Sequence, residues 1–139
     1  MPRTTSTPAP VRFIHPNDTP DRYAVTGRGT CMAPLIADGA MLVCDKTNEP
    51  ASGDVVLIHF TEAFGRRYGS PGVAKRLATP PPPAGFSGYV VAEQLNPLRR
   101  YTFHTDDVLA VHKCIGFADA GTSAGDMVRF SSNQEPPRC

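Results

Sequence analysis

The sequence lacks any apolar run near the roughly 20 residues that a membrane-spanning helix requires. Its N-terminal segment, MPRTTSTPAP, also lacks the apolar core of a signal peptide. We therefore expect a cytoplasmic protein that has no membrane among its partners.

The sequence also lacks an excess of charge of either sign. Its formal net charge is +1, and acidic residues are interspersed among basic pairs such as Arg66-Arg67 and Arg99-Arg100. Without a long basic stripe, broad attraction to nucleic acid is not expected. The segment before Tyr23 is too short for a helix-turn-helix domain and has no helical period, so we expect no direct sequence-specific DNA binding by this chain.

Patterns for disulfides and metal sites are missing as well. The chain has four cysteines, Cys31, Cys44, Cys114 and Cys139. None forms a C-x-x-C pair and the chain is not cysteine-dense, so we expect reduced thiols. The histidines stand singly, and His59 and His112 lie within apolar strand patterns, where we expect them to be satisfied members of a sheet. No metal and no cofactor is predicted.

What the sequence does contain is a series of short strand patterns separated by turn signals, which predicts one mostly β domain over residues 22–117. Residues 1–21 predict a flexible N-terminal arm, and residues 118–139 a polar, disordered tail around the apolar stretch 127–130. The predicted strands cover residues 22–26, 41–45, 55–60, 72–78, 88–93, 100–104 and 108–116.

The connections between these strands carry further expectations. We expect strands 41–45 and 55–60 to be neighbours, residues 61–71 to be a loop or the bend of a long hairpin, and the prolines of 80–83 to form a spacer that cannot pair in a sheet. Alternation along strand 72–78 points Val73, Lys75 and Leu77 to one face. The Lys75 ammonium is therefore expected among apolar neighbours.

The stretch from Tyr23 to Asp45, YAVTGRGTCMAPLIADGAMLVCD, places a glycine-rich loop between two strands. Glycine permits positive φ, so such a loop can hold a side chain and nearby amide groups at fixed angles, and Cys31 is the reactive residue that it presents. The run from Met32 to Ala37 favours a short helix starting at Met32 or Pro34. Such a helix would place its N-terminal N–H groups beside Cys31, where they stabilise a thiolate or an oxyanion.

The order of motifs is more specific than any one of them. Gly-x-Cys-Met-x-Pro, Asp-Gly, a strand, Pro-x-x-Gly-Asp-Val-Val and Val-x-Lys-Arg-Leu follow one another in the chain. This succession resembles the C-terminal peptidase domain of the LexA, UmuD and phage-repressor family (peptidase S24-like), from about Tyr23 to Phe117. The resemblance implies a LexA/signal-peptidase-like β-ribbon fold of several short twisted strands with little helix, and a homodimer.

The resemblance also implies a site. In that family a serine directly before the methionine is the nucleophile, and a lysine in the Val-x-Lys-Arg-Leu strand is its general base; here these positions are Cys31 and Lys75. Cysteine thus stands where serine is expected, and Gly29, Thr30 and Met32 are implied to shape the oxyanion loop. A thiol beside a cationic lysine can ionise, and the ammonium can later protonate the leaving amine.

Two functional hypotheses remain open. The first is a peptidase that uses Cys31 and Lys75 in a bacterial or phage stress response or in repressor regulation, with a repressor, a RecA-type filament or a repair polymerase as protein partner. The second is a catalytically inactive dimerisation or interaction module, because a site shaped for serine need not accept the larger sulfur. The resemblance implies self-cleavage at an Ala-Gly or Cys-Gly bond, but neither pair precedes Tyr23, which favours cleavage of another chain, or no cleavage, over self-cleavage.

Overall fold

The computed structural model describes residues 15–27, 31–33, 35–36, 38–118 and 128–129. The strands are β1 (Arg22–Thr26), β2 (Met41–Asp45), β3 (Val55–Phe60), β4 (Gly72–Leu77), β5 (Tyr89–Leu95), β6 (Leu98–His104), β7 (Val108–Ala118) and β8 (Val128–Arg129). The helical elements are η1 (Pro16–Asp18), α1 (Glu62–Tyr68) and η2 (Thr105–Asp107). The mostly β fold predicted from the sequence is confirmed.

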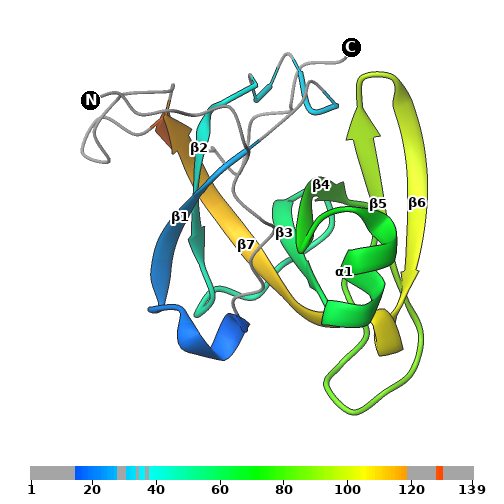
Figure 1. Cartoon of the computed structure of the whole chain (residues 1–139). Helices are drawn as coiled ribbons and strands as arrows, with labels where there is room; N and C mark the ends of the chain where they lie inside the picture. The colour runs from blue at the N-terminus through cyan, green and yellow to red at the C-terminus, as the bar shows by residue number, and fades with distance from the viewer. Residues whose placement is uncertain (1–14, 28–30, 34, 37, 119–127, 130–139) are drawn as a thin grey trace, which may run out of the picture.

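The strands form one antiparallel sheet in the order β1-β2-β7-β3-β4-β5-β6, with β8 also paired to β7. Figure 1 shows β7 running diagonally between β1 and β2 on one side and β3 on the other. The prediction that strands 41–45 and 55–60 are neighbours is wrong, because β7 pairs with both β2 and β3 and separates them. A partner so distant in the chain leaves no local signal in either strand.

Two apolar clusters pack on the sheet. The Cys44 cluster consists of Met32, Ile36, Ala40, Leu42, Cys44, Val55, Leu57, Leu95 and Cys114. The Phe60 cluster consists of Val56, Ile58, Phe60, Leu77, Val90, Ala92 and Phe103. Successive residues of β3 enter the two clusters in turn, because side chains alternate between the faces of a strand. β3 is therefore buried on both faces.

The connection between β3 and β4 contains helix α1, where the sequence predicts a loop or a hairpin bend. The Thr61 hydroxyl accepts a hydrogen bond from the Phe64 N–H at 3.2 Å, which caps the helix, and Gly69 ends it with φ 96°. The helix is too short to be stable alone, so packing of its aromatic side chains has to hold it. Figure 1 shows α1 beside β3 and β4.

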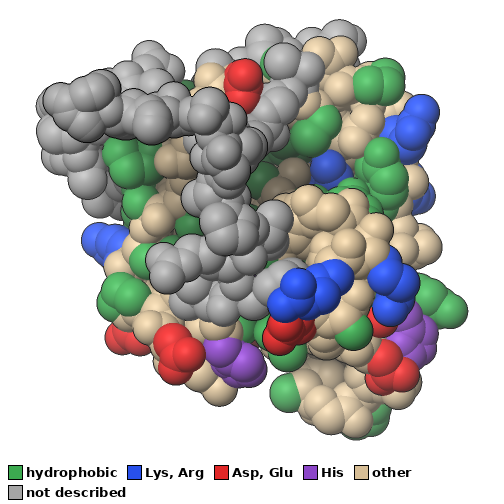
Figure 2. Space-filling model, in the orientation of Figure 1, with side chains coloured by type: hydrophobic (Ala, Val, Ile, Leu, Met, Phe, Trp, Pro, Cys, Tyr) green, Lys and Arg blue, Asp and Glu red, His purple; other side chains and the backbone are tan. Residues whose placement is uncertain are grey.

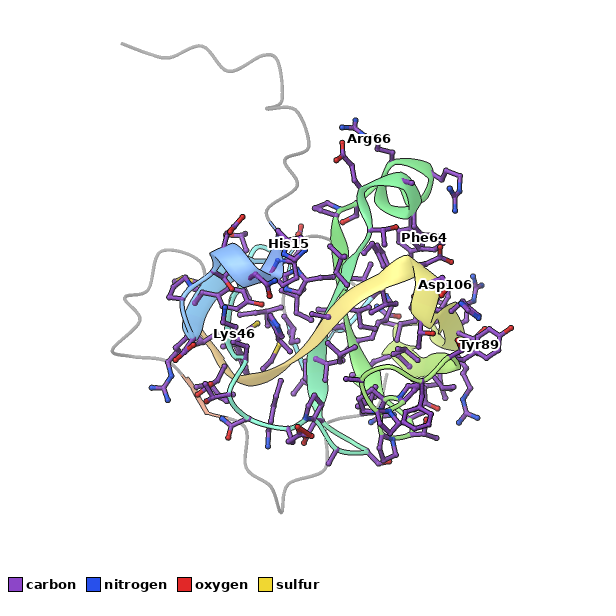
Figure 3. The ribbon with its side chains drawn as sticks, turned by 90° about the horizontal axis from the view of Figure 1, so that it is seen from below. His15, Lys46, Phe64, Arg66, Tyr89 and Asp106 are labelled. Atoms are coloured by element: carbon purple, nitrogen blue, oxygen red, sulfur yellow. The ribbon has the colours of Figure 1, made fainter. Side chains whose placement is uncertain are left out.

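Residues 15–21, the last part of the predicted flexible arm, pack against the end of β2. Pro16 is buried, and the Lys46 Nζ donates hydrogen bonds to the carbonyl oxygens of Pro16 at 3.1 Å and Thr19 at 2.5 Å. Figure 3 shows His15 and Lys46 on the same side of the molecule. These contacts correct the arm prediction for residues 15–21, and the rest of that prediction falls on residues outside the described part.

The prediction of a disordered tail needs a similar correction at two residues. Val128 and Arg129 form β8, which pairs with Phe117 and Gly116 of β7. The other tail residues, 119–127 and 130–139, lie outside the described part of the chain. The polyproline segment, in contrast, contains no strand, as the sequence predicts.

β4 begins at Gly72, where the backbone of β3 comes unusually close. A Cβ added at Gly72 would lie 2.6 Å from the Ile58 carbonyl oxygen, so only glycine fits without a backbone shift. From this start the β3–β4 register runs to the pair Val56–Lys75. Backbone pairing of β4 with β3, the strand that is buried on both faces, therefore fixes the position of Lys75 in the sheet.

The surface agrees with the charge pattern of the sequence. On the face shown in Figure 2, Lys and Arg side chains are spread out and several lie beside Asp or Glu. No helix in the described part of the chain is long and apolar enough to cross a membrane.

Candidate active site

The loop that carries Cys31 connects β1 to β2, and hydrogen bonds join its two ends. The Gly27 N–H donates a hydrogen bond to the Ala40 carbonyl at 2.8 Å, and the Gly39 N–H donates one to the Gly27 carbonyl at 2.9 Å. Gly39 has φ 86°, a conformation that glycine adopts without strain. The two ends of the loop are thus tied together, so that Cys31 is presented from a closed turn.

The described residues of this loop form turns rather than the predicted helix over 32–37. The Ile36 N–H donates to the Met32 carbonyl at 2.9 Å, which is a single helix-like hydrogen bond. Met32 and Ile36 are both 4% exposed and belong to the Cys44 cluster. The loop is therefore anchored by packing, and stabilisation of Cys31 by a helix N-terminus has no support in these residues. Gly29 and Thr30, the other predicted oxyanion-loop residues, lie outside the described part.

A second anchor comes from the far end of the sheet. The Cys31 carbonyl oxygen accepts two hydrogen bonds, from the Leu95 N–H at 2.8 Å and the Asn96 N–H at 2.9 Å. These donors stand at the turn between β5 and β6, where the Asn96-Pro97 peptide bond is cis. Because two donors hold one carbonyl, the backbone of Cys31 is fixed relative to the β5–β6 hairpin.

Lys75 reaches Cys31 from β4. Its side chain is 3% exposed, and its Nζ donates a hydrogen bond to the Cys31 Sγ at 3.4 Å. Cys31 itself is partly exposed and packs against the Cys44 cluster, whereas Val73 and Leu77 beside Lys75 belong to or pack on the Phe60 cluster. The structure thus brings together the two residues that the sequence singled out, although they are 44 positions apart.

In the described part of the chain, the Lys75 ammonium lies near an aromatic ring and is not paired with a carboxylate. Among the described residues it forms no ion pair with a carboxylate, and its Nζ lies 5.2 Å from the centre of the Tyr101 ring. Lysine is almost never fully buried without a partner, because an unpaired buried charge is costly. Within the described part of the chain, the partners of this ammonium are the Cys31 sulfur and the face of the Tyr101 ring.

Glu93, an acid that lies opposite Arg76 in the pairing of β4 with β5, is engaged elsewhere. It receives hydrogen bonds from Arg100 at 3.0 Å and Arg76 at 3.1 Å, which bridge β4, β5 and β6. Hydrogen bonding from Arg100 is the main cause that lowers the pKa of the Glu93 carboxyl, partly opposed by burial and reinforced by Arg76. Glu93 thus stabilises the hairpin next to the site without neutralising Lys75.

Tyr101 belongs to a group of aromatic side chains, which we call the aromatic cluster: Phe60, Phe64, Tyr68, Tyr101 and Phe103. Within it Phe60 lies 4.7 Å from Phe64 and 5.1 Å from Phe103 between ring centres, and Tyr101 stacks on Phe103 at 6.1 Å with an 8° angle. Burial raises the pKa of the Tyr68 phenol, with smaller contributions from Tyr101 and Cys31, so Tyr68 stays neutral beside the pair. Helix α1 supplies two of these rings.

A second polar group lies between β1, β3 and β7. The Tyr23 hydroxyl lies 2.7 Å from the His59 Nε2 and 2.5 Å from the His112 Nδ1, which confirms both histidines as satisfied members of the sheet. Burial is the main cause that lowers the pKa of His59, to about 4, and the pKa of His112 is also lowered by burial. The Cys44 and Cys114 sulfurs lie 3.5 Å apart, both buried.

This second group is not arranged as a metal centre. Among the described residues, no group of three or more His, Cys, Asp or Glu side chains is placed to hold a metal ion. Burial and its contact with Cys44 raise the pKa of the Cys114 thiol, the hydrogen bond to Cys44 being the larger cause. The shifts of the Cys114, His59 and His112 pKa values therefore all favour the neutral forms of these side chains.

The fold and the site together define a mostly β domain in which a thiol and a buried amine from distant segments meet. A family model, Peptidase S24-like, matches residues 4–77, which is more than half of the chain and includes both Cys31 and Lys75. The chain therefore belongs to the Peptidase S24-like family, as the motif order predicts. Neither a curated protein nor a solved structure matches the chain.

The structure adds residues to the site that the sequence analysis did not single out. Tyr101 approaches the ammonium of Lys75, and the Leu95 and Asn96 amides hold the Cys31 carbonyl. Tyr101 and Phe103 are two positions apart in a predicted strand, so alternation places both side chains on the same face. The residues that this face contacts depend on the pairing of β4 with β5. Backbone amides carry no residue-specific signal at all.

Proposed function

We propose that this member of the Peptidase S24-like family hydrolyses peptide bonds with Cys31 as the nucleophile and Lys75 as the proton carrier. The observation that carries the proposal is the 3.4 Å contact between the Cys31 sulfur and the ammonium of a lysine that is 3% exposed and has no carboxylate partner among the described residues. A lysine retained at such a cost has a role that an apolar residue of similar size would not fill.

In the acylation step, the thiol proton passes to Lys75 and the Cys31 sulfur attacks the carbonyl carbon of the scissile bond. A carbon–sulfur bond forms, and the carbonyl oxygen takes up the negative charge of the tetrahedral intermediate. The carbon–nitrogen bond then breaks, and the Lys75 ammonium gives its proton to the leaving amine. The products of this step are a free amine and a thioester on Cys31, with Lys75 neutral.

In the deacylation step, neutral Lys75 accepts a proton from a water molecule, whose oxygen attacks the thioester carbon. The carbon–sulfur bond breaks, the carboxylic acid leaves, and the proton on Lys75 is shared again with the Cys31 sulfur. Burial of Lys75 supports both steps, because a proton held away from solvent is delivered at the reacting atoms.

We further propose that the substrate is another protein chain in a regulatory setting such as a stress response or repressor control, and that the chain acts as a homodimer. The resemblance to LexA and UmuD supports this setting, and the absence of an Ala-Gly or Cys-Gly pair before Tyr23 supports cleavage of a partner. A RecA-type filament, a repressor and a repair polymerase are the partner types that the resemblance suggests.

The test is cleavage of a proteome-derived peptide library by the full chain, with the new peptide ends identified by mass spectrometry. We expect Cys31→Ala to abolish cleavage, and Lys75→Met to slow it by about a hundredfold or more, because positioned acid–base groups contribute rates of that order. Lys113→Met is the matched control: Lys113 is on β7, which β3 separates from β4, its Nζ lies 3.6 Å from an Asp54 carboxylate oxygen, and the substitution should leave cleavage unchanged.

Two results would contradict the proposal. Cleavage that persists in Cys31→Ala, or that proceeds at the wild-type rate in Lys75→Met, rules out the dyad. A wild-type chain that cuts no peptide and whose Cys31 reacts with iodoacetamide no faster than in Lys75→Met supports the second hypothesis, an inactive interaction module in which Cys31 is an apolar filler.

A further inference from the structure

The Lys75 ammonium has two neighbours of very different chemistry. The Cys31 sulfur accepts its hydrogen bond at 3.4 Å, and the Tyr101 ring centre lies 5.2 Å from its Nζ. The face of an aromatic ring carries negative charge density and attracts a cation within about 6 Å of its centre. The same face has no such attraction for a neutral amine, so the ring favours the protonated form of Lys75.

The Tyr101 ring is itself held in place. It lies almost parallel to the Phe103 ring, with an angle of 8° and a centre distance of 6.1 Å. Phe103 is 4% exposed, and its ring centre lies 5.1 Å from that of Phe60 and 6.0 Å from that of Tyr68. Figure 3 shows Phe64 on α1, the helix that completes this packing. The position of Tyr101 therefore depends on residues of β3, β6 and α1, and is not a free rotamer choice.

We propose that Tyr101 is the positioning residue of the Cys31–Lys75 pair: its ring holds the Lys75 ammonium against the Cys31 sulfur and favours the thiolate–ammonium form. This inference rests on the proposed function. Tyr101 does not touch the reacting bond; it acts through Lys75 in the way that a third group orients the base in other nucleophile–base pairs. A carboxylate would fill this place in many sites, but among the described residues none pairs with Lys75.

The competing explanation is that Tyr101 only packs against the stem of Lys75. Tyr101→Phe and Tyr101→Leu separate the two explanations. Phenylalanine keeps the ring face and removes the hydroxyl, whereas leucine keeps an apolar side chain and removes the ring. If the ring face matters, Tyr101→Phe behaves as wild type and Tyr101→Leu does not; if an apolar side chain against the Lys75 stem is sufficient, both variants behave as wild type.

The probe is iodoacetamide, and the measurement is the rate of Cys31 alkylation at pH 7 and at pH 10, followed by peptide mass spectrometry. At pH 7 we expect Tyr101→Leu to react about three- to tenfold more slowly than wild type, since loss of a cation–ring contact of ordinary strength has an effect of that order. At pH 10 free thiols ionise without help, so the variants should converge. Tyr101→Phe should stay within about twofold of wild type at both pH values.

Tyr89→Leu is the matched control, because Tyr89 is a 58% exposed tyrosine on β5 whose ring contacts His104. Figure 3 shows Tyr89 at the edge of the molecule near Asp106. Its alkylation rates should equal those of wild type. Thermal unfolding of each variant shows whether it is folded, and Tyr101→Met replaces Tyr101→Leu if the latter does not fold.

Lys75→Met distinguishes a failure of this inference from a failure of the proposed function. If Lys75→Met leaves the pH 7 rate unchanged, the Cys31–Lys75 pair itself is refuted. If Lys75→Met slows Cys31 but Tyr101→Leu does not, the pair stands and the role of Tyr101 is refuted. A Tyr101→Phe variant that is as slow as Tyr101→Leu also overturns the inference, because it assigns the effect to the hydroxyl.

Discussion

Cys31 and the Cys44–Cys114 pair share one apolar cluster, yet they have opposite chemical surroundings. Cys44 and Cys114 are 0% and 2% exposed, and each thiol has the other sulfur 3.5 Å away. Cys31 packs on the edge of the same cluster, is partly exposed, and has a lysine ammonium 3.4 Å away. Three thiols in one part of the fold therefore provide a built-in comparison.

The difference lies in the neighbouring group, which is a second buried thiol for the pair and an ammonium for Cys31. In the pair, the hydrogen bond from its neighbour and burial raise the pKa of Cys114, so the thiolate is suppressed. The nearby Tyr23 hydroxyl also has a raised pKa, with burial the main cause, and stays neutral. At Cys31 the neighbouring group is positively charged, which is the environment in which catalytic thiolates are found.

The sharpest way to break this comparison is selective alkylation. We expect iodoacetamide at neutral pH to label Cys31 roughly a hundredfold faster than Cys44 or Cys114, because the buried thiols need both ionisation and local opening of the sheet before they react. Peptide mass spectrometry after timed quenching gives the three rates in one sample. Equal labelling of Cys31 and Cys114 would show that the cation at Cys31 has no effect on its thiol.

The same comparison shows how far the sequence alone leads. The bounds of β1, β2 and β3 match the predicted strands, and the motif order indicates Cys31 and Lys75 from the sequence alone. Strand bounds follow from local alternation and turn residues, which a single sequence records. The motif order then related two residues whose contact local patterns cannot show.

What the sequence did not predict depends on distant pairing. β7 inserts between β2 and β3, and this insertion brings Cys114 opposite Cys44 and His112 next to Tyr23. No local pattern in β2 records that neighbour. Tyr101 likewise reaches Lys75 only because β4, β5 and β6 are consecutive in the sheet.

The wrong prediction of a loop where helix α1 forms has a different cause, because the sequence signals for this helix are local. Thr61 and Gly69 are good cap residues at the two ends, and Arg66 and Arg67 stand in the last turn, where cations are favoured. The glycine at position 65 and the glycines that follow argued for a loop. Packing of Phe64 and Tyr68 against Phe60 decided the outcome, and a propensity argument cannot include it.

The second prediction concerns the free energy of unfolding as the pH is lowered. The pKa of His59 falls from its ordinary value of 6.5 to about 4 in the folded chain, mainly by burial, with His112, His15 and Lys46 as positive neighbours and Tyr23 as its hydrogen-bond partner. Below pH 6.5 the unfolded chain therefore binds more protons than the folded chain at this site. The contribution of His59 to the free energy of unfolding should therefore decrease between pH 6.5 and 4 and change no further below 4.

A shift of this size corresponds to about 3 kcal/mol when complete, and partial exposure of the ring reduces the expected loss to about 2 kcal/mol. Urea unfolding at a series of pH values measures it. His59→Gln should reduce the slope between pH 6.5 and 4, leaving the contributions of His112 and of the Glu93 and Asp45 carboxyls, whereas His104→Gln, on the η2 side of the sheet, should keep the full slope. A slope that His59→Gln leaves unchanged would place the acid sensitivity elsewhere.

The smallest expected effect is on stability, where replacing the buried Cys114 thiol should matter more than the lost packing of Cys31. Cys114→Ala removes a sulfur that is 2% exposed and leaves Cys44 without its partner, so we expect it to cost about 1 kcal/mol of unfolding free energy or slightly more. In a Lys75→Met background, where no buried ammonium loses its partner, Cys31→Ala removes a partly exposed sulfur at the edge of the same cluster and should cost about half as much. Guanidinium unfolding of these variants gives the two values, and iodoacetamide labelling of Cys31 in Cys114→Ala should proceed at the wild-type rate. If Cys31→Ala is the more destabilising of the two even in that background, Cys31 is held in place as core, and its contact with Lys75 is a consequence of packing rather than a site selected for its chemistry.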